Sequence, residues 1–167
     1  VSMPSFPPVG STVPLFSCAL GLRVALLDGN WVTAVRTAAI TLLAAQYLAP
    51  PKSRRIGLIG AGVQARSHLA AFREHFPIDE VRVFSRTEQS AKQLADQINL
   101  PAGKVCVESD PTELLQNSDI VISTVPASKG LVPFLDPNHL PVPSFAGMVD
   151  CGRSWLLNDL PTSDWVV

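Results

Sequence analysis

A short glycine-rich segment has the residue types and the spacing needed to hold a phosphate. Residues 60–65 read Gly-Ala-Gly-Val-Gln-Ala, the pattern of a dinucleotide-binding turn. Gly60 permits a tight turn from strand to helix, Gly62 has no Cβ to obstruct a pyrophosphate, and the small Ala65 lets the helix pack closely on the strand. Because the free N–H groups of a helix N-terminus attract anions, the pattern predicts a nucleotide site here.

The predicted strand over 80–85 ends at a second group of polar residues. Val63 and Gln64 complete the glycine turn, and the predicted helix over 64–75 leads into this strand, which ends at Ser85 and is followed by Arg86 and Thr87. An NAD enzyme usually carries a carboxylate at this place for the ribose hydroxyls, whereas a guanidinium accommodates a 2′-phosphate. These residues favour NADP(H) over NAD(H). The alternative is a solvated charge at Arg86 and a Thr87 that only caps the next helix.

Three further residues are candidates for chemistry. Thr124 follows an apolar strand, where a nucleotide contact is expected at the carboxyl end. Asp150 follows the next predicted strand and is a candidate acid or base, although it is equally suited to form a turn before Gly152. Arg36 lies in a helix of small and apolar residues and needs an anionic partner if it is buried, but has no special meaning if it is exposed.

The remaining reactive residue types show no spacing that predicts a site. His68 and His75 lie seven residues apart on the helix after the glycine turn, so surface positions are expected. Three cysteines without metal-ligand spacing indicate reduced thiols, and Cys151 is expected to be buried. We therefore expect no metal site.

These residues must be positioned by alternating strands and helices. A Pro-rich start is followed by a predicted hairpin, in which residues 22–27 and a strand from Trp31 flank the Asp28-Gly29-Asn30 turn. We expect helices over 33–48, 64–75, 88–98 and 111–117, a helical turn near 137–140, and strands over 55–59, 80–85, 104–107, 119–124, 146–150 and 164–167. The alternation predicts an α/β fold with a Rossmann-like, doubly wound parallel sheet over 51–167. We expect residues 1–50 to form a partial N-terminal element, for which the family resemblance described below implies substrate binding or dimerisation.

Composition narrows the classes of partner. The 167 residues are 47% hydrophobic with a net charge of -1, which fits a globular protein and argues against nucleic acid as a partner. We expect neither a secretory signal nor a membrane span, because prolines interrupt the first 22 residues and the longest apolar stretch is short. A cytoplasmic location is expected. The chain does not begin with Met and stops inside a predicted strand, so we expect a fragment.

Two motifs at their relative spacing resemble one protein family. The run Leu27 to Ala39, with Arg36-Thr-Ala-Ala, precedes the 60–65 turn by about twenty residues, and Val83-Phe-Ser-Arg-Thr follows the turn. Together they resemble the ornithine cyclodeaminase/mu-crystallin family over residues 22–125. The resemblance implies that Arg36 binds a substrate carboxylate and that the 60–65 turn and Thr124 contact the cofactor. It also implies that residues 85–87 accept NADPH and that Asp150 assists the chemistry at the amine.

The resemblance implies an NADPH-dependent reductase of a cyclic imine (ketimine) carboxylate that works as a homodimer. One alternative is an NAD-dependent ornithine cyclodeaminase, against which Ser85 and Arg86 count. Another is a protein of the same fold that binds the nucleotide or a small ligand without turnover. The absence of any Lys before Lys52 favours that second alternative.

Overall fold

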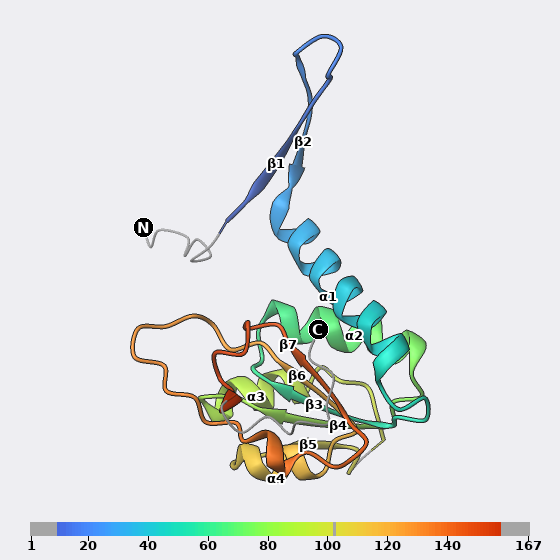
Figure 1. Cartoon of the computed structure of the whole chain (residues 1–167), viewed down its shortest axis with the longest axis vertical. Coiled ribbons are helices and arrows are strands. Elements are labelled where there is room, and N and C mark those ends of the chain that lie inside the picture. The colour runs from blue at the N-terminus through green and yellow to red at the C-terminus, as the bar shows by residue number, and fades with distance from the viewer. Residues whose placement is uncertain (1–9, 102, 158–167) are drawn as a thin grey trace. The chain divides into compact units, whose positions relative to one another are not determined.

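The computed structural model of the chain describes residues 10–101 and 103–157 (Figure 1). Within them, the strands are β1 Thr12–Phe16, β2 Arg23–Asp28, β3 Arg55–Ile59, β4 Glu80–Phe84, β5 Val105–Val107, β6 Ile120–Ser123 and β7 Phe145–Met148. The helices are α1 Gly29–Leu48, α2 Val63–His75, α3 Glu88–Ala95, α4 Pro111–Gln116 and the 3₁₀ turn η1 Pro137–His139. The chain divides into two compact units, residues 1–36 and 37–167, and we describe each by itself. The predicted domain division at 50/51 stays a prediction.

The second unit is built on a five-stranded parallel sheet with the order β5-β4-β3-β6-β7. The chain starts in the middle at β3, moves outward through β4 and β5, and then crosses back to β6 and β7. The direction of winding therefore reverses beside β3, and ligands bind at such a reversal in open α/β sheets. This arrangement confirms the predicted Rossmann-like, doubly wound fold.

Two hydrophobic clusters cover the two faces of this sheet. One joins the C-terminal half of α1 with α2 and α3, and contains Leu42, Phe72 and Leu94 against Ile56 and Val83. The other lies under α4 and includes Leu114, Ile59 and Trp155. The alternation of Leu58 and Ile59 between the two clusters is the period of two expected of a strand covered on both faces. Leu69 and Phe72 of α2 and its C-cap residue Phe76 are all buried.

Helix α1 lies directly on β7. A Cβ placed on Gly147 would be 2.7 Å from Cγ2 of Thr41 and 2.9 Å from Cδ1 of Ile122. Real Cβ atoms essentially never come this close to another heavy atom, so the helix can lie here only against a residue without a side chain. The glycine therefore sets the distance between α1 and the sheet.

The first unit corrects the predicted hairpin. Strand β2 pairs with β1 in antiparallel register, not with a strand from Trp31. Asp28, Gly29 and Asn30 form the start of α1 instead of a hairpin turn, and Trp31 is helical. The Asp28 carboxylate accepts a hydrogen bond from the Asn30 N–H at 2.9 Å, which is a helix-capping contact. Thr33, expected to cap the helix, therefore lies inside it.

Most other boundaries agree within a few residues. Helix α3 ends at Ala95 and not at residue 98, and β7 covers 145–148 where 146–150 was expected. The predicted strand over 164–167 lies outside the described residues. Within the described part of the chain, no helix is both long enough and apolar enough to cross a bilayer.

Candidate functional site

The glycine turn lies between the ends of the two strands that flank β3. The Gly60 N–H donates to the Phe84 carbonyl at the end of β4, at 2.8 Å. On the other side, the Thr124 N–H donates to the Ile59 carbonyl, also at 2.8 Å. Parallel pairing thus brings the turn, the residues after β4 and the residues after β6 to one edge of the sheet. These are three of the places that the sequence predicted.

Gly60 is required by both its backbone and its surroundings. Its φ of +105° lies in a region that side chains rarely allow, and a Cβ there would be 2.5 Å from Oγ1 of Thr124. The Thr124 hydroxyl in turn donates to the Ile59 carbonyl at 3.1 Å. Thr124 therefore packs against the turn, and the close approach needs a glycine.

Gly62 has the opposite environment. It is the N-cap of α2, no atom lies within 4 Å of the place its Cβ would take, and no described side chain caps the helix. The next residue, Val63, is 63% exposed, whereas Ala65 is fully buried against the sheet. The N–H groups of the first turn of this helix therefore face open space. This geometry fits the phosphates of a dinucleotide.

The residues after β4 leave a cation available. Ser85 is half-buried, Arg86 and Thr87 are exposed, and none of the ion pairs among the described residues involves Arg86. Thr87 is the N-cap of α3, as expected, but its side chain does not cap the helix. Its hydroxyl instead lies 2.7 Å from that of Ser90. A guanidinium and two hydroxyls therefore stand next to the glycine turn without a carboxylate among residues 85–87.

Asp150 lies in a buried hydrogen-bond network and not on an open surface. Its Oδ1 accepts from the Ser123 hydroxyl at 3.0 Å and from the Gly152 N–H at 3.2 Å, and its Oδ2 accepts from the Ser154 hydroxyl. The carboxylate is only 3% exposed. The Gly152 contact is that of a turn-former, one of the two roles expected of this residue.

Ser123 is a functional candidate that the sequence prediction missed. Besides donating to Asp150, its hydroxyl accepts from Nε1 of Trp155 at 2.9 Å. It is fully buried and directly precedes Thr124, so it links the Asp150 network to the glycine turn. A polar residue at the end of the apolar run Ile120–Ser123 was the signal that could have revealed it.

Comparison with known proteins decides the family. The family model of the ornithine cyclodeaminase/mu-crystallin family matches residues 2–141. The chain belongs to this family. Its relatives include the ketimine reductase mu-crystallin of Macropus fuliginosus, which is 37% identical over 122 residues and is matched over 73% of this chain and 38% of its own length. The resemblance noted in the sequence is thereby confirmed.

Solved structures of similar proteins agree in fold. The Δ1-pyrroline-2-carboxylate reductase of Thermococcus litoralis, in complex with NADH and L-proline, has a TM-score of 0.75 at 28% identity and covers 86% of this chain and 45% of its own. An archaeal alanine dehydrogenase dimer with bound NAD has the same TM-score and identity, with 84% and 42% covered. This chain thus spans less than half the length of the family relatives that it matches.

Within this family member, Arg36 and Cys151 are both exposed. Arg36 lies in the second turn of α1 and belongs to the first unit. Its exposure fits a solvated charge, so its role as the substrate-carboxylate ligand rests on the family resemblance and stays a prediction. Cys151 was expected to be buried, but it is exposed in the turn after Asp150, where its φ is 58°. No group of metal-ligating side chains occurs among the described residues.

His68 corrects a second expectation. It is fully buried between α2 and α1, whereas His75, one heptad further along α2, is exposed as expected. Its Nδ1 lies 2.7 Å from the Gln64 carbonyl, and its Nε2 lies 3.1 Å from Oγ1 of Thr41. Burial lowers the pKa of the imidazole below its ordinary value, although the bond to the Gln64 carbonyl opposes the shift. The heptad spacing did not reveal this because α1 covers only one of the two positions.

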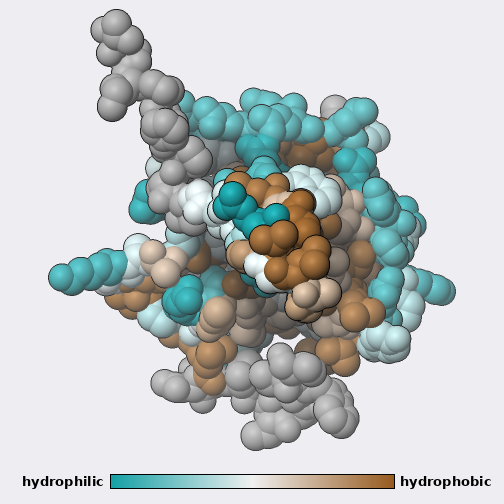
Figure 2. Space-filling view, turned by 90° about the horizontal axis from the view of Figure 1, so that it is seen from above, coloured by the Kyte–Doolittle hydropathy of each residue, from teal (hydrophilic) through white to brown (hydrophobic). Residues whose placement is uncertain are grey.

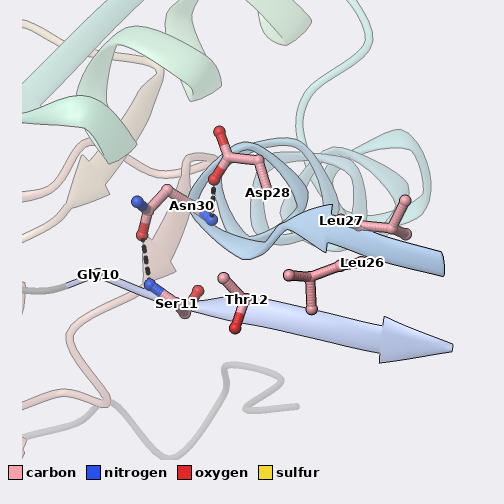
Figure 3. A pocket seen from close by; sticks show the side chains of 7 residues that line it. All are labelled: Gly10, Ser11, Thr12, Leu26, Leu27, Asp28 and Asn30. Carbon is pink, nitrogen blue, oxygen red and sulfur yellow. Dashed lines mark hydrogen bonds between the residues drawn. The ribbon is translucent and has the colours of Figure 1, made fainter. Parts of the chain in front are cut away.

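A separate hollow lies entirely within the first unit (Figure 3). It measures about 490 Å³ and is lined by Gly10, Ser11, Thr12, Leu26, Leu27, Asp28 and Asn30. Its one charged side chain, Asp28, already accepts the Asn30 N–H, and Asn30 accepts the Ser11 N–H at 3.0 Å. These polar groups satisfy one another at the start of α1. Because these groups are already hydrogen-bonded to one another, we place the candidate site at the strand ends of the second unit.

Proposed function

We propose that this chain contributes the nucleotide-binding part of an NADPH-dependent reductase of a cyclic imine carboxylate. The observation that carries the proposal is the open helix N-terminus at Gly62 beside Arg86, which forms no ion pair with another described residue. The 60–65 turn, including Val63 and Gln64, would hold the pyrophosphate, and Thr124 would contact the cofactor from the β6 side. When bound, the nicotinamide cofactor supplies the hydride, and the protein supplies orientation and charge.

The preference for NADP(H) is supported by residues 85–87. A 2′-phosphate would gain a charge-assisted bond from Arg86 and hydrogen bonds from the hydroxyls of Ser85 and Thr87. A ribose without that phosphate would find no carboxylate there to accept its hydroxyl protons. The two solved relatives contain NADH and NAD, so NAD(H) is the alternative that the first experiment must separate.

For the substrate, we propose a small imino or amino acid. Arg36 would bind its carboxylate, since a guanidinium and a carboxylate pair in bidentate geometry. The family resemblance assigns Asp150 to the proton at the substrate nitrogen, but the residue is 3% exposed and already accepts from Ser123, Ser154 and the Gly152 N–H, which favours its turn-forming role. The support for a cyclic imine is the relation to a ketimine reductase and to a pyrroline carboxylate reductase. A homodimer is part of the proposal.

Two other functions stay open within the same family. An ornithine cyclodeaminase that uses NAD would share the fold and the glycine turn, but Arg86 and the missing carboxylate count against it. A protein that binds NADPH or a small ligand without turnover would also share the fold and the glycine turn. Measured reduction of a cyclic imine by the protein separates the reductase from both.

The decisive experiment is a side-by-side titration of the chain with NADPH and NADH, followed by nucleotide fluorescence. We expect tighter binding of NADPH, and loss of that preference in Arg86→Ala. Lys52→Ala is the matched control, because it removes the same charge from an exposed loop before β3, at the other edge of the sheet. Equal affinity for both nucleotides in the wild type, or an unchanged preference in Arg86→Ala, would contradict the NADP(H) assignment.

A further inference from the structure

His68 joins the nucleotide turn to another helix. Its Nδ1 contacts the carbonyl of Gln64 in the first turn of α2, and its Nε2 contacts the hydroxyl of Thr41 in α1. Thr41 is itself fixed, since its methyl group lies against Gly147 of β7. A chain of three contacts thus runs from the sheet through α1 to the turn that faces the phosphates.

The protons in this network can be counted. A carbonyl oxygen only accepts, so Nδ1 of His68 carries the hydrogen that is shared with Gln64. The lowered pKa keeps the imidazole neutral, which leaves Nε2 as an acceptor. The Thr41 hydroxyl must then donate to His68, although it also lies 3.1 Å from the Thr37 carbonyl. The Thr41 hydroxyl proton is therefore shared between the Thr37 carbonyl and Nε2 of His68, while the Gln64 carbonyl fixes the tautomer with hydrogen on Nδ1.

A purely apolar core would not need this arrangement. The His68 ring continues a stack with Phe72 and Phe76, with centroid separations of 6.4 and 5.7 Å. A phenylalanine at position 68 would extend this stack and would leave no polar atom to satisfy. The histidine instead makes two directed contacts, one of them to a backbone atom within the nucleotide motif.

We propose that His68 is a positioning residue for the nucleotide turn. It holds the first turn of α2 in place through Thr41, so the affinity for the nucleotide depends on the contact between α2 and α1. The inference rests on the proposed function for its link to NADPH, but the ordering of the turn can be measured without any ligand.

The test uses His68→Phe and Thr41→Val in the full chain, with His75→Phe as the matched control. His75 lies on the same helix and contacts the Ala71 carbonyl through Nδ1 at 3.3 Å, but it is exposed. We expect His68→Phe and Thr41→Val each to weaken NADPH binding roughly fivefold, the worth of one hydrogen bond. The double variant should lose no more than either single variant, since both remove the same link. The control should bind as the wild type does.

A second readout separates this inference from the proposed function. Amide hydrogen exchange of Arg66, whose N–H donates to the Gly62 carbonyl at 3.2 Å, reports the order of the first turn without ligand. We expect faster exchange at Arg66 in both variants and no change in the control. Unchanged exchange and unchanged NADPH affinity, even with a shifted melting temperature, would show that His68 only fills the core. A wild type that binds no NADPH would overturn the proposed function, and the exchange rates would still decide the role of His68.

Discussion

At the scale of single residues, the two glycines of the nucleotide turn should respond in opposite ways to one added methyl group. Gly60→Ala places a Cβ 2.5 Å from Oγ1 of Thr124 at a φ of +105°, so we expect a loss of about 1–3 kcal/mol in unfolding free energy. Gly62→Ala meets no atom, so stability should change by less than about 1 kcal/mol. Its methyl group would obstruct the pyrophosphate, and NADPH binding should weaken at least tenfold, or about 1.4 kcal/mol. Urea unfolding and nucleotide titration of both variants check this, and a Gly62→Ala protein that binds normally would contradict the site.

His68 should make stability depend on pH in the weakly acidic range. Its pKa is lowered in the folded chain, so below about pH 6.5 the unfolded chain binds more protons at this position than the folded chain does. Stability is therefore complete above the unfolded pKa and falls as the pH falls toward the folded value. We expect a lower urea midpoint at pH 5.5 than at pH 7.5, and a smaller difference in His68→Phe. The same difference in both proteins would show that other groups cause it.

Arg36 gives a direct test of the substrate side. Arg36→Ala should raise the KM for a cyclic imine carboxylate by about 10–100-fold, the usual worth of a charge-assisted hydrogen bond. Its effect on NADPH affinity should be small, because the residue is expected to touch the substrate and not the nucleotide. Steady-state kinetics with both substrates varied separate the two effects. An equal loss of both affinities would argue against the assigned role.

At the scale of elements, the packing of α1 on β7 can be tested at one position. Gly147→Ala would force its Cβ against Thr41 and Ile122, so we expect a loss of about 1–3 kcal/mol in unfolding free energy. Gly62→Ala is the control, because it adds the same methyl group in open space. If α1 moves away from β7 and the contact between Thr41 and His68 is lost, the affinity for NADPH should fall as well. Equal stability of the two variants would mean that α1 can move away from β7 without cost.

The start of α1 shows where local pattern and real structure differ. Asp28-Gly29-Asn30 has the composition of a hairpin turn, and the sequence prediction treated it as one. In the structure, the same short polar side chains cap a helix, because Asp28 accepts the Asn30 N–H and Asn30 accepts the Ser11 N–H. The second contact joins residues 19 positions apart, so it could not be read from the local sequence.

At the scale of the whole molecule, the first unit exposes more apolar surface than a stable hairpin should. Leu20, Leu22, Val24 and Leu26 are each at least 60% exposed, and Figure 2 shows hydrophobic side chains gathered over the hairpin, seen end-on. An isolated two-stranded hairpin is marginally stable in water. Contact with a second copy of the chain would bury this apolar surface, which agrees with the proposed homodimer.

The oligomeric state should follow this surface. We expect size-exclusion chromatography with light scattering to give a dimer, and Leu22→Lys with Val24→Lys to shift it toward the monomer. Val132→Lys is the control, because Val132 is also exposed, at 74%, but lies in a loop of the second unit. A monomeric wild type, or dissociation by the control as well, would contradict a dimer through the hairpin.

The sequence by itself determined the Rossmann-like sheet, most of its helices and the glycine turn, whose role in nucleotide binding stays a prediction. Those features depend on local signals: apolar periodicity, a glycine spacing, and the residues that follow each strand. It also identified the family, which the comparisons confirmed. The roles of Arg36, Arg86 and Asp150 stay predictions that the experiments above address.

Only the tertiary structure decided which residues are buried together. The burial of His68 depends on helix α1, which covers it. The hydrogen bond from Ser123 to Asp150 and the contact between Gly60 and Thr124 join segments that lie far apart in the sequence. Burial and pairing are properties of packed neighbours, so a residue's type and its spacing along the chain do not contain them.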